Sequence, residues 1–176
     1  MLVKTIMNRY LKALIVICGL YFCDALAEEA PSFQNNILKI PRVDAPEQVG
    51  KYQNAEFSLA PDGRWDLLQA NEAQWAFIEE IEVKILESFP VQIHVAVVGY
   101  LPTPCYRLGP INKRYVDNRF EIAVNMTSPP AGTTCIAVLE PFETAIPLDV
   151  YGLLEGIYQV QVNDKSGSFV LNKDNQ

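Results

Sequence analysis

The feature that most constrains this fold is a series of segments in which apolar and polar residues alternate. In residues 78–86 the apolar residues, among them Ile81 and Val83, alternate with charged ones. Residues 91–101 and 119–126 repeat the pattern with Val, Ile and Phe at the apolar positions. A period of two places successive side chains on opposite faces of a β-strand, so each segment predicts a strand with one buried face.

Four more apolar segments, each bounded by Gly, Pro or Asn, bring the predicted strands to about seven. They cover residues 135–139, 144–150, 157–163 and 168–171. No long amphipathic helix pattern is present that could cover one face of a sheet instead. Short strands with turns roughly every 8–12 residues are typical of two packed antiparallel sheets. The sequence therefore predicts an all-β fold, an antiparallel β-sandwich.

One segment favours the immunoglobulin-like form of this sandwich. Between Gly152 and Val162, an apolar residue and a Gly turn precede Tyr158, and alternating valines follow it. In immunoglobulin-like domains a tyrosine at such a place hydrogen-bonds to the backbone a few residues upstream. A buried tyrosine hydroxyl needs a partner of this kind. We therefore predict that Tyr158 is a structural corner in an immunoglobulin-like β-sandwich of about seven strands.

The alternating segments also divide the chain into a sandwich and its flanks. The sandwich is predicted for residues 76–172, followed by a tail at 173–176. Residues 28–75 are predicted to be an N-terminal extension with a β-hairpin, in which residues 56–60 pair with residues 65–69 across a Pro-Asp-Gly turn.

Two weaker patterns lie on either side of this hairpin. Residues 37–43 predict a short edge strand, because Pro41 lacks the N–H that a central strand would donate. Residues 71–80 predict a helical turn with Asn71 as its N-terminal cap.

The first 27 residues have the pattern of a secretory signal peptide. Three basic residues precede an apolar run at 13–22, and the Ala-Leu-Ala at 25–27 fits a cleavage site. The run is about ten residues long, short of the roughly 20 that a spanning helix needs. Cleavage after Ala27 predicts a periplasmic or extracellular protein without a membrane span. The alternative is that the segment stays attached as an anchor.

The charge of the chain argues against a nucleic-acid partner. Removal of residues 1–27 takes away three basic side chains and one acidic one, so the formal net charge of −7 becomes −9. A strongly acidic protein is repelled by DNA, RNA and anionic lipid. We therefore expect any partner to be another extracytoplasmic protein.

The cysteine content predicts one disulfide. Two of the four cysteines leave with the signal peptide, so only Cys105 and Cys135 remain. An even pair in an oxidising compartment forms a disulfide by default. Two cysteines and the single histidine are too few soft ligands for a zinc site, so we predict no metal.

Residues 80–171 resemble a group of uncharacterised bacterial secreted and lipid-anchored proteins with an immunoglobulin-like β-sandwich domain. The shared pattern is Gly-x-Leu-Pro-x-x-Cys at 99–105, a second cysteine at 135, Pro-Phe-Glu at 141–143 and Gly-Leu-x-x-Gly-x-Tyr-x-Val-x-Val-Asn at 152–163. The resemblance implies a sandwich with one disulfide and implies no activity. The chain departs from the group in having Asp164 where many members have Gly. It also lacks a lipidation cysteine.

Residues that could perform catalysis are sparse. The only histidine, His94, lies in a predicted strand on its outward face, where a solvated or packed side chain is the commoner role. No serine has the Gly-x-Ser-x-Gly context of a hydrolase nucleophile. We therefore predict no catalytic residue, no cofactor and no enzymatic activity.

The preferred function is a secreted, non-catalytic binding or structural module whose specific role the residues do not indicate. Its predicted interaction loop carries Tyr100, Tyr106 and Arg107 beside the disulfide, because Tyr and Arg are frequent anchors in interfaces. Two alternatives remain open. One is a protease-inhibitor-like domain that uses residues 100–110, and the other is an uncharacterised enzyme.

Overall fold

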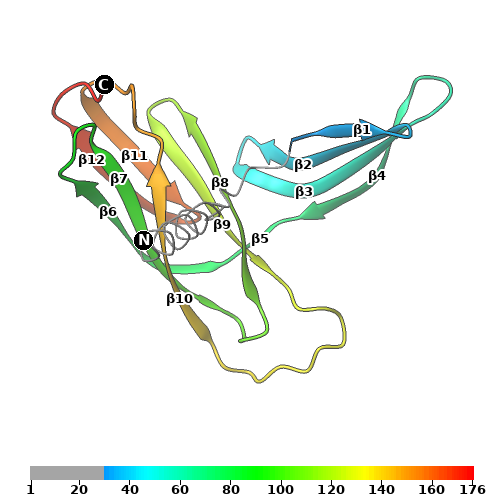
Figure 1. The fold of residues 1–176 in the computed structure, drawn as a ribbon. Coiled ribbons are helices and arrows are strands. Elements are labelled where there is room, and N and C mark those ends of the chain that lie inside the picture. Colours follow the sequence, from blue (N-terminus) through cyan, green and yellow to red (C-terminus); the bar gives the residue numbers. More distant parts are fainter. Residues whose placement is uncertain (1–29) are drawn as a thin grey trace, which may run out of the picture. The chain divides into compact units, whose positions relative to one another are not determined.

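The computed structural model describes residues 30–176, which form strands and turns and contain no helix (Figure 1). The expected signal peptide at 1–27 lies outside these residues. The strands in chain order are β1 (Ser32–Gln34), β2 (Ile37–Ala45), β3 (Gln48–Leu59), β4 (Trp65–Glu72), β5 (Gln74–Trp75), β6 (Phe77–Leu86), β7 (Gln92–Leu101), β8 (Arg107–Val116), β9 (Arg119–Thr127), β10 (Glu140–Leu148), β11 (Gly156–Val162) and β12 (Lys165–Leu171).

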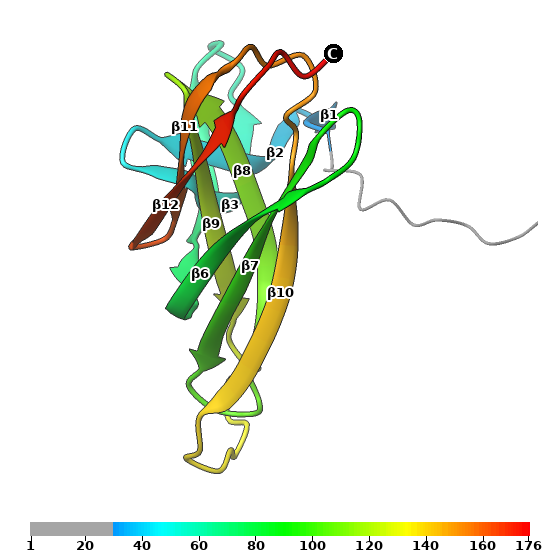
Figure 2. The same ribbon diagram turned by 90° about the vertical axis from the view of Figure 1, so that its left-hand side faces the viewer.

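Strands β5 to β12 form a β-sandwich, so the predicted all-β sandwich fold is confirmed. One sheet has the strand order β10-β7-β6, and the other has the order β12-β11-β9-β5, with β8 also paired to β9 (Figure 2). The inward residues of β7, which are Ile93, Val95 and Val97, have 0% exposure. They pack in one core with inward residues of the opposite sheet, such as Val124 and Val160. Burial of these alternate apolar residues is the main force that holds the two sheets together.

The sandwich is closed along both of its sides. On one side the Lys113 ammonium of β8 donates to the Pro147 carbonyl of β10 at 3.0 Å and lies 3.1 Å from the Asp149 carboxylate. On the other side β12 approaches β6 so closely that a Cβ added at Gly167 would lie 3.2 Å from Val83 Cγ2. The edge strands of one sheet are thus covered by those of the other, which limits unwanted pairing at these edges.

Strands β9 and β11 pair in parallel, which is the exception among the described strand pairs of an otherwise antiparallel sandwich. The pairing ends at Val162, opposite Ile122, and Asn163 then turns the chain with a positive φ of 49°. The Asn163 amide accepts from the Val124 N–H at 2.9 Å and donates to the carbonyls of Val124 and Ala76 at 3.1 and 2.9 Å. This buried side chain therefore joins β9, β11 and the start of the β6 segment.

The Tyr158 side chain makes the type of contact that the sequence pattern predicts. Its hydroxyl donates to the Leu154 carbonyl at 2.8 Å, four residues upstream. Its ring stacks on Phe169 with the ring centroids 5.3 Å apart. The contact holds the turn before β11 against the core.

Three predictions about single elements are wrong. The strand at residues 37–43, expected at the edge of a sheet, is part of β2 and lies between β1 and β3. The other two concern the type of element. Residues 71–80, expected to form a helical turn, contain the end of β4, the short β5 and the start of β6. Residues 135–139, expected to form a strand, are irregular, and the seventh long strand of the sandwich is β8 instead. In both segments the outcome depends on tertiary pairing, because a segment forms a strand only where a neighbouring strand can pair with it.

The N-terminal extension forms a four-stranded sheet with the order β1-β2-β3-β4. It contains the predicted hairpin, with Leu59 of β3 opposite Trp65 of β4. The register places Phe33, Leu38, Phe57 and Leu67 in one row across the four strands. One face of this sheet therefore carries an apolar row that crosses all four strands.

The far end of the β2–β3 hairpin is bonded to β8 of the sandwich. The Arg42 guanidinium donates to the Lys113 carbonyl at 3.0 Å, and Arg114 donates to the Ala45 carbonyl at 3.0 Å. Asp44 accepts from Arg42 and from the Gly50 N–H, both at 2.7 Å. Residues 31–176 accordingly form one compact unit.

The last residues are bonded to the sandwich as well. Asn175 is 1% exposed, and its amide accepts from the Val91 N–H at 2.6 Å and donates to the carbonyls of Val91 and Val150. The residues predicted as a tail therefore fasten the segment before β7 to the segment after β10.

Replacing Asn163 by alanine should lower the free energy of unfolding by about 3 kcal/mol or more. The change leaves one buried N–H and two buried carbonyls without their amide partner, and each costs about 1–3 kcal/mol. Alanine is also strained at a positive φ. Urea denaturation would measure the loss. Asn71→Ala, at an exposed position of β4, should change stability by less than about 0.5 kcal/mol. An equal effect of the two substitutions would contradict the role assigned to Asn163.

Replacing Asp44 by asparagine should destabilise the protein at neutral pH and have little effect at pH 2. The hydrogen bond from Arg42 is the main cause that lowers the pKa of Asp44 below its ordinary value of 3.8. A carboxyl whose pKa is lower in the folded than in the unfolded state stabilises the fold at pH values above its unfolded-state pKa. This contribution disappears as the pH falls through the folded-state pKa. Urea denaturation at the two pH values would measure it. As a control at an exposed loop position, Glu87→Gln should change the stability at neutral pH by less than about 0.5 kcal/mol.

Candidate functional site

Two loops at one end of the sandwich form the candidate site (Figure 2). The first, residues 102–106, joins β7 to β8, and the second, residues 128–139, joins β9 to β10. Strand β7 ends at Leu101 because Pro102 and Pro104 have no N–H to donate to a ladder. The Tyr106 N–H then donates to the Thr103 carbonyl at 3.1 Å, which turns the chain into β8.

A disulfide joins the two loops, and the predicted pair is confirmed. Cys105 and Cys135 are bonded, with their Cα atoms 6.1 Å apart and 30 residues between them in sequence. The bond holds the middle of the long loop beside the short one. We call the two loops together the cystine-tethered end.

The long loop exposes a group of apolar side chains just after the disulfide. Ile136 is 67% exposed, Val138 56% and Leu139 59%. Within residues 30–176, no backbone hydrogen bond reaches residues 134–139. These residues precede β10, whose ladder with β7 begins at the pair Glu140 and Leu101. The loop therefore presents these apolar side chains to solvent on irregular backbone that bends at Ala137.

The three residues of the predicted interaction loop are not displayed together. Tyr106 is half-buried and packs against the core. Arg107 is exposed, but its guanidinium donates to the carbonyls of Pro104 and Tyr106 within its own loop. Tyr100 lies on the outer face of β7. Hydrogen bonding to the Glu79 carboxylate raises the pKa of the Tyr100 hydroxyl, so Tyr100 stays protonated at neutral pH.

The exposure of the apolar group at 136–139 does not follow from the sequence pattern, which predicts a strand at residues 135–139. A signal was present in the prolines. Prolines remove backbone donors from both segments that would have to pair. Pro129 and Pro130 precede the apolar group, and Pro102 and Pro104 lie in the segment that would have been its neighbour. A strand-like segment whose expected neighbour is interrupted by proline is a candidate for exposure.

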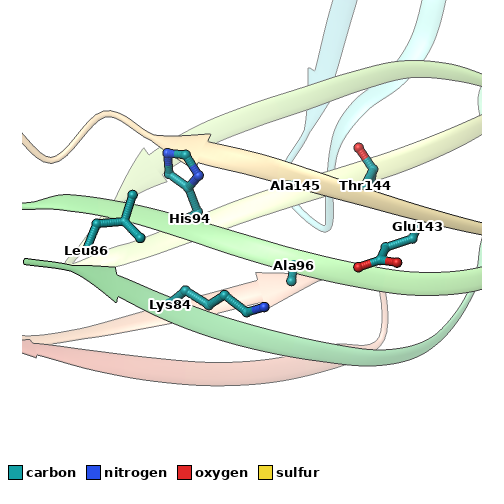
Figure 3. Close-up of a pocket in the computed structure, with 7 residues that line it drawn as sticks. All are labelled: Lys84, Leu86, His94, Ala96, Glu143, Thr144 and Ala145. Atoms are coloured by element: carbon teal, nitrogen blue, oxygen red, sulfur yellow. The ribbon is translucent and has the colours of Figure 1, made fainter.

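His94 lines a shallow trough on the outer face of the β10-β7-β6 sheet (Figure 3). The trough has a volume of about 380 Å³, and Ala96 and Ala145 form part of its lining. The register places His94 between Lys84 of β6 and Pro147 of β10. Lys84 is itself paired with Glu82 at 3.2 Å. Among the described residues that line the trough there is no hydrogen-bonded nucleophile and base.

The described residues contain no group of three or more His, Cys, Asp or Glu side chains that could hold a metal ion. No helix between residues 30 and 176 is long and apolar enough to cross a membrane. The arrangement that stands out chemically is therefore the uncharged and exposed segment of the cystine-tethered end.

Reduction of the disulfide should lower the stability of the protein by about 3–4 kcal/mol. The bond closes a loop of 30 residues, and the chain-entropy estimate for such a loop lies in this range. Urea denaturation of the mature protein with and without reductant would measure the loss. The Cys105→Ser/Cys135→Ser double variant should equal the reduced protein and show no response to reductant. Free thiols in the denatured, unreduced mature protein would contradict the pairing.

Comparison with known proteins agrees with the fold of this part of the chain. A sequence model of the ORF11 beta-sandwich domain matches residues 95–171, which run from the middle of β7 to the end of β12. Searches of curated proteins and of solved structures gave no match. The matched residues include both cysteines of the disulfide, the exposed segment at 134–139, Tyr158 and Asn163, so this region is similar to a β-sandwich domain.

Proposed function

We propose that this protein is an extracytoplasmic, non-catalytic module that binds another protein through its cystine-tethered end. The observation that carries the proposal is the exposure of Ile136, Val138 and Leu139 on a loop held by a disulfide. Contiguous exposed apolar side chains on a soluble domain mark interaction sites more often than scattered ones do.

The construction of the loop favours binding. The Cys135 end is fixed by the disulfide, and the other end continues into the ladder of β10 with β7. Fixing both ends of a segment limits its conformations, so it loses less conformational entropy when a partner binds, and more of the contact energy appears as affinity. Each of the three apolar side chains is more than half exposed and can lose most of that area in a complex.

The location of the protein rests on the signal-peptide pattern and is supported by the disulfide. Disulfides persist in oxidising compartments and are rare in the cytosol. The predicted net charge of the mature chain also supports a protein partner over a nucleic acid.

The two alternative functions have less support from the geometry. Residues 102–106 are half-buried and residues 107–110 belong to β8, so the 100–110 segment lacks the protruding loop that enters a protease cleft. An enzyme would need a base with an acceptor or nucleophile beside it, and His94 has Lys84 and Pro147 as its cross-strand neighbours.

Replacing Ile136 by aspartate should abolish capture of the partner by the mature protein. A charge at the centre of an apolar contact has to be desolvated, so we expect at least about a tenfold loss of bound partner. The measurement is a pull-down from periplasm or culture medium, followed by quantitative mass spectrometry. Ile157→Asp is the matched control, because Ile157 is 68% exposed on β11 in the same domain.

Proteins retained by wild type and Ile157→Asp, but lost with Ile136→Asp, would support the binding site. Equal retention by both variants would contradict it, as would the absence of any specifically captured protein. Urea denaturation of both variants would establish that they fold equally well.

A further inference from the structure

A polar trough with a volume of about 430 Å³ lies on the outer face of the sheet that contains β9, β11 and β12 (Figure 2). Its polar side chains are those of Arg119, Gln159, Gln161, Ser166 and Ser168. The other two residues of the lining contribute backbone only. Val160 is buried in the core, and a Cβ on Gly167 would point toward Val83 of β6. Every side chain that faces the trough can therefore form hydrogen bonds.

The strand register places these polar side chains next to one another. Gln159 of β11 lies between Arg119 of β9 and Ser168 of β12. In the next row, Gln161 lies opposite Ser166. Side chains alternate along a strand, so these residues face away from the core while their neighbours in sequence fill it. The trough is thus crossed by two polar rows.

Most of these polar groups are available to a ligand. Within residues 30–176, the Gln159 amide and the Ser166 and Ser168 hydroxyls make no hydrogen bond. Gln161 uses one N–H to donate to the Asn163 carbonyl at 3.2 Å. A Gln amide has two donors and an acceptor, and a Ser hydroxyl both donates and accepts. The trough therefore offers donors and acceptors side by side.

Arg119 is held beside these rows by an ion pair. Its Nη2 lies 3.0 Å from the Glu121 carboxylate, and its side chain is still 43% exposed. Glu121 also accepts from Arg114 Nε at 2.9 Å, and Arg114 donates to the Pro46 carbonyl at 3.1 Å. Arg119 Nε has no acceptor within the described residues, so the ion pair does not use all the donors of the guanidinium. This network positions Arg119 in advance, which lowers the entropic cost of binding.

The chemistry of the trough narrows the class of ligand. The charge of Arg119 is balanced by Glu121, and the mature chain has a formal net charge of −9, so an anion is disfavoured. An apolar ligand would meet no apolar side chain among the described residues of the lining. A peptide strand needs unpaired backbone, but β11 is already paired with β9 and β12. A neutral ligand rich in hydroxyl groups fits the remaining requirements.

We propose that this trough binds a neutral oligosaccharide. A sugar hydroxyl both donates and accepts, so it can pair with the amide, hydroxyl and guanidinium groups alike. The volume lies in the range of roughly 300–1,000 Å³ that is usual for small-molecule sites. The trough lies on the face of a sheet, so further sugar units can extend beyond it. This site is separate from the cystine-tethered end and does not depend on the proposed protein-binding function.

Two-dimensional NMR of the ¹⁵N-labelled mature protein tests the proposal, with maltohexaose, cellohexaose and chitotetraose as neutral probes. A few exposed hydrogen bonds that replace bonds to water predict a dissociation constant on the order of 1 mM. At a concentration of about 10 mM, at least one probe should therefore shift the amide signals of β11 and β12 at the trough. Hexagalacturonate, an anionic probe, should shift them less.

A substitution at the centre of the trough locates the binding. Gln159→Met removes the amide while nearly keeping the size of the side chain, and should raise the dissociation constant about 3- to 10-fold. Gln92→Met is the matched control, because Gln92 is exposed on β7 of the opposite sheet. It should bind the probe as wild type does. The same spectra report whether each variant is folded.

An absence of shifts with all three neutral probes would overturn the proposal. An unchanged dissociation constant in Gln159→Met would overturn it as well, since the binding would then lie elsewhere. Tighter binding of hexagalacturonate than of every neutral probe would make the trough an anion site instead. If the sugars fail to bind but Ile136→Asp still abolishes capture of a protein, the proposed function stands without this second site.

Discussion

The structure depends on the burial of the facing sides of two sheets, and β7 lies at the centre of that contact. Ile93, Val95 and Val97 of β7 are fully buried against inward residues of β9, β11 and β12. Apolar burial is non-directional, so it brings the two sheets together without determining which strands lie next to one another. Directional contacts supply that specificity. The buried Asn163 and Asn175 side chains hydrogen-bond through their amide groups to backbone atoms that are 25 to 87 residues away in sequence.

Period-two alternation was sufficient to predict the strands that have one face in the core. Strands β6, β7, β9 and β11 were all expected from it, because each places every second residue in the same apolar layer. Strand β8 was missed because it lies at the edge of its sheet and bonds through polar groups. Its Lys113 and Arg114 contact β10 and the N-terminal sheet, so its inward and outward residues do not differ cleanly in polarity.

At residues 135–139 the reverse occurred, because a predicted strand is absent. The reason again lies in the neighbouring strands. Apolar and β-branched residues predict a strand only where a neighbour can complete the ladder, and Pro102 ends that neighbour at Leu101. For the candidate site, the pairing of Cys105 with Cys135 could be predicted from counting cysteines in an oxidising compartment. The positions of Tyr106 and Arg107 could not, because they depend on where the chain turns between β7 and β8.

The packing of the core is largely independent of the exposed side chains of the cystine-tethered end. Substitutions at these two places should therefore have different effects on stability. The packing of β7 against β9 and β11 determines whether the domain folds, while residues 136–139 make no backbone hydrogen bond within the described chain and contribute little to that packing. The disulfide links the two by fixing the loop to the end of β7. Substitutions in the loop can therefore change the exposed surface of the domain at small cost in stability, provided that the cystine remains. A binding module built in this way can keep one scaffold and vary one exposed segment.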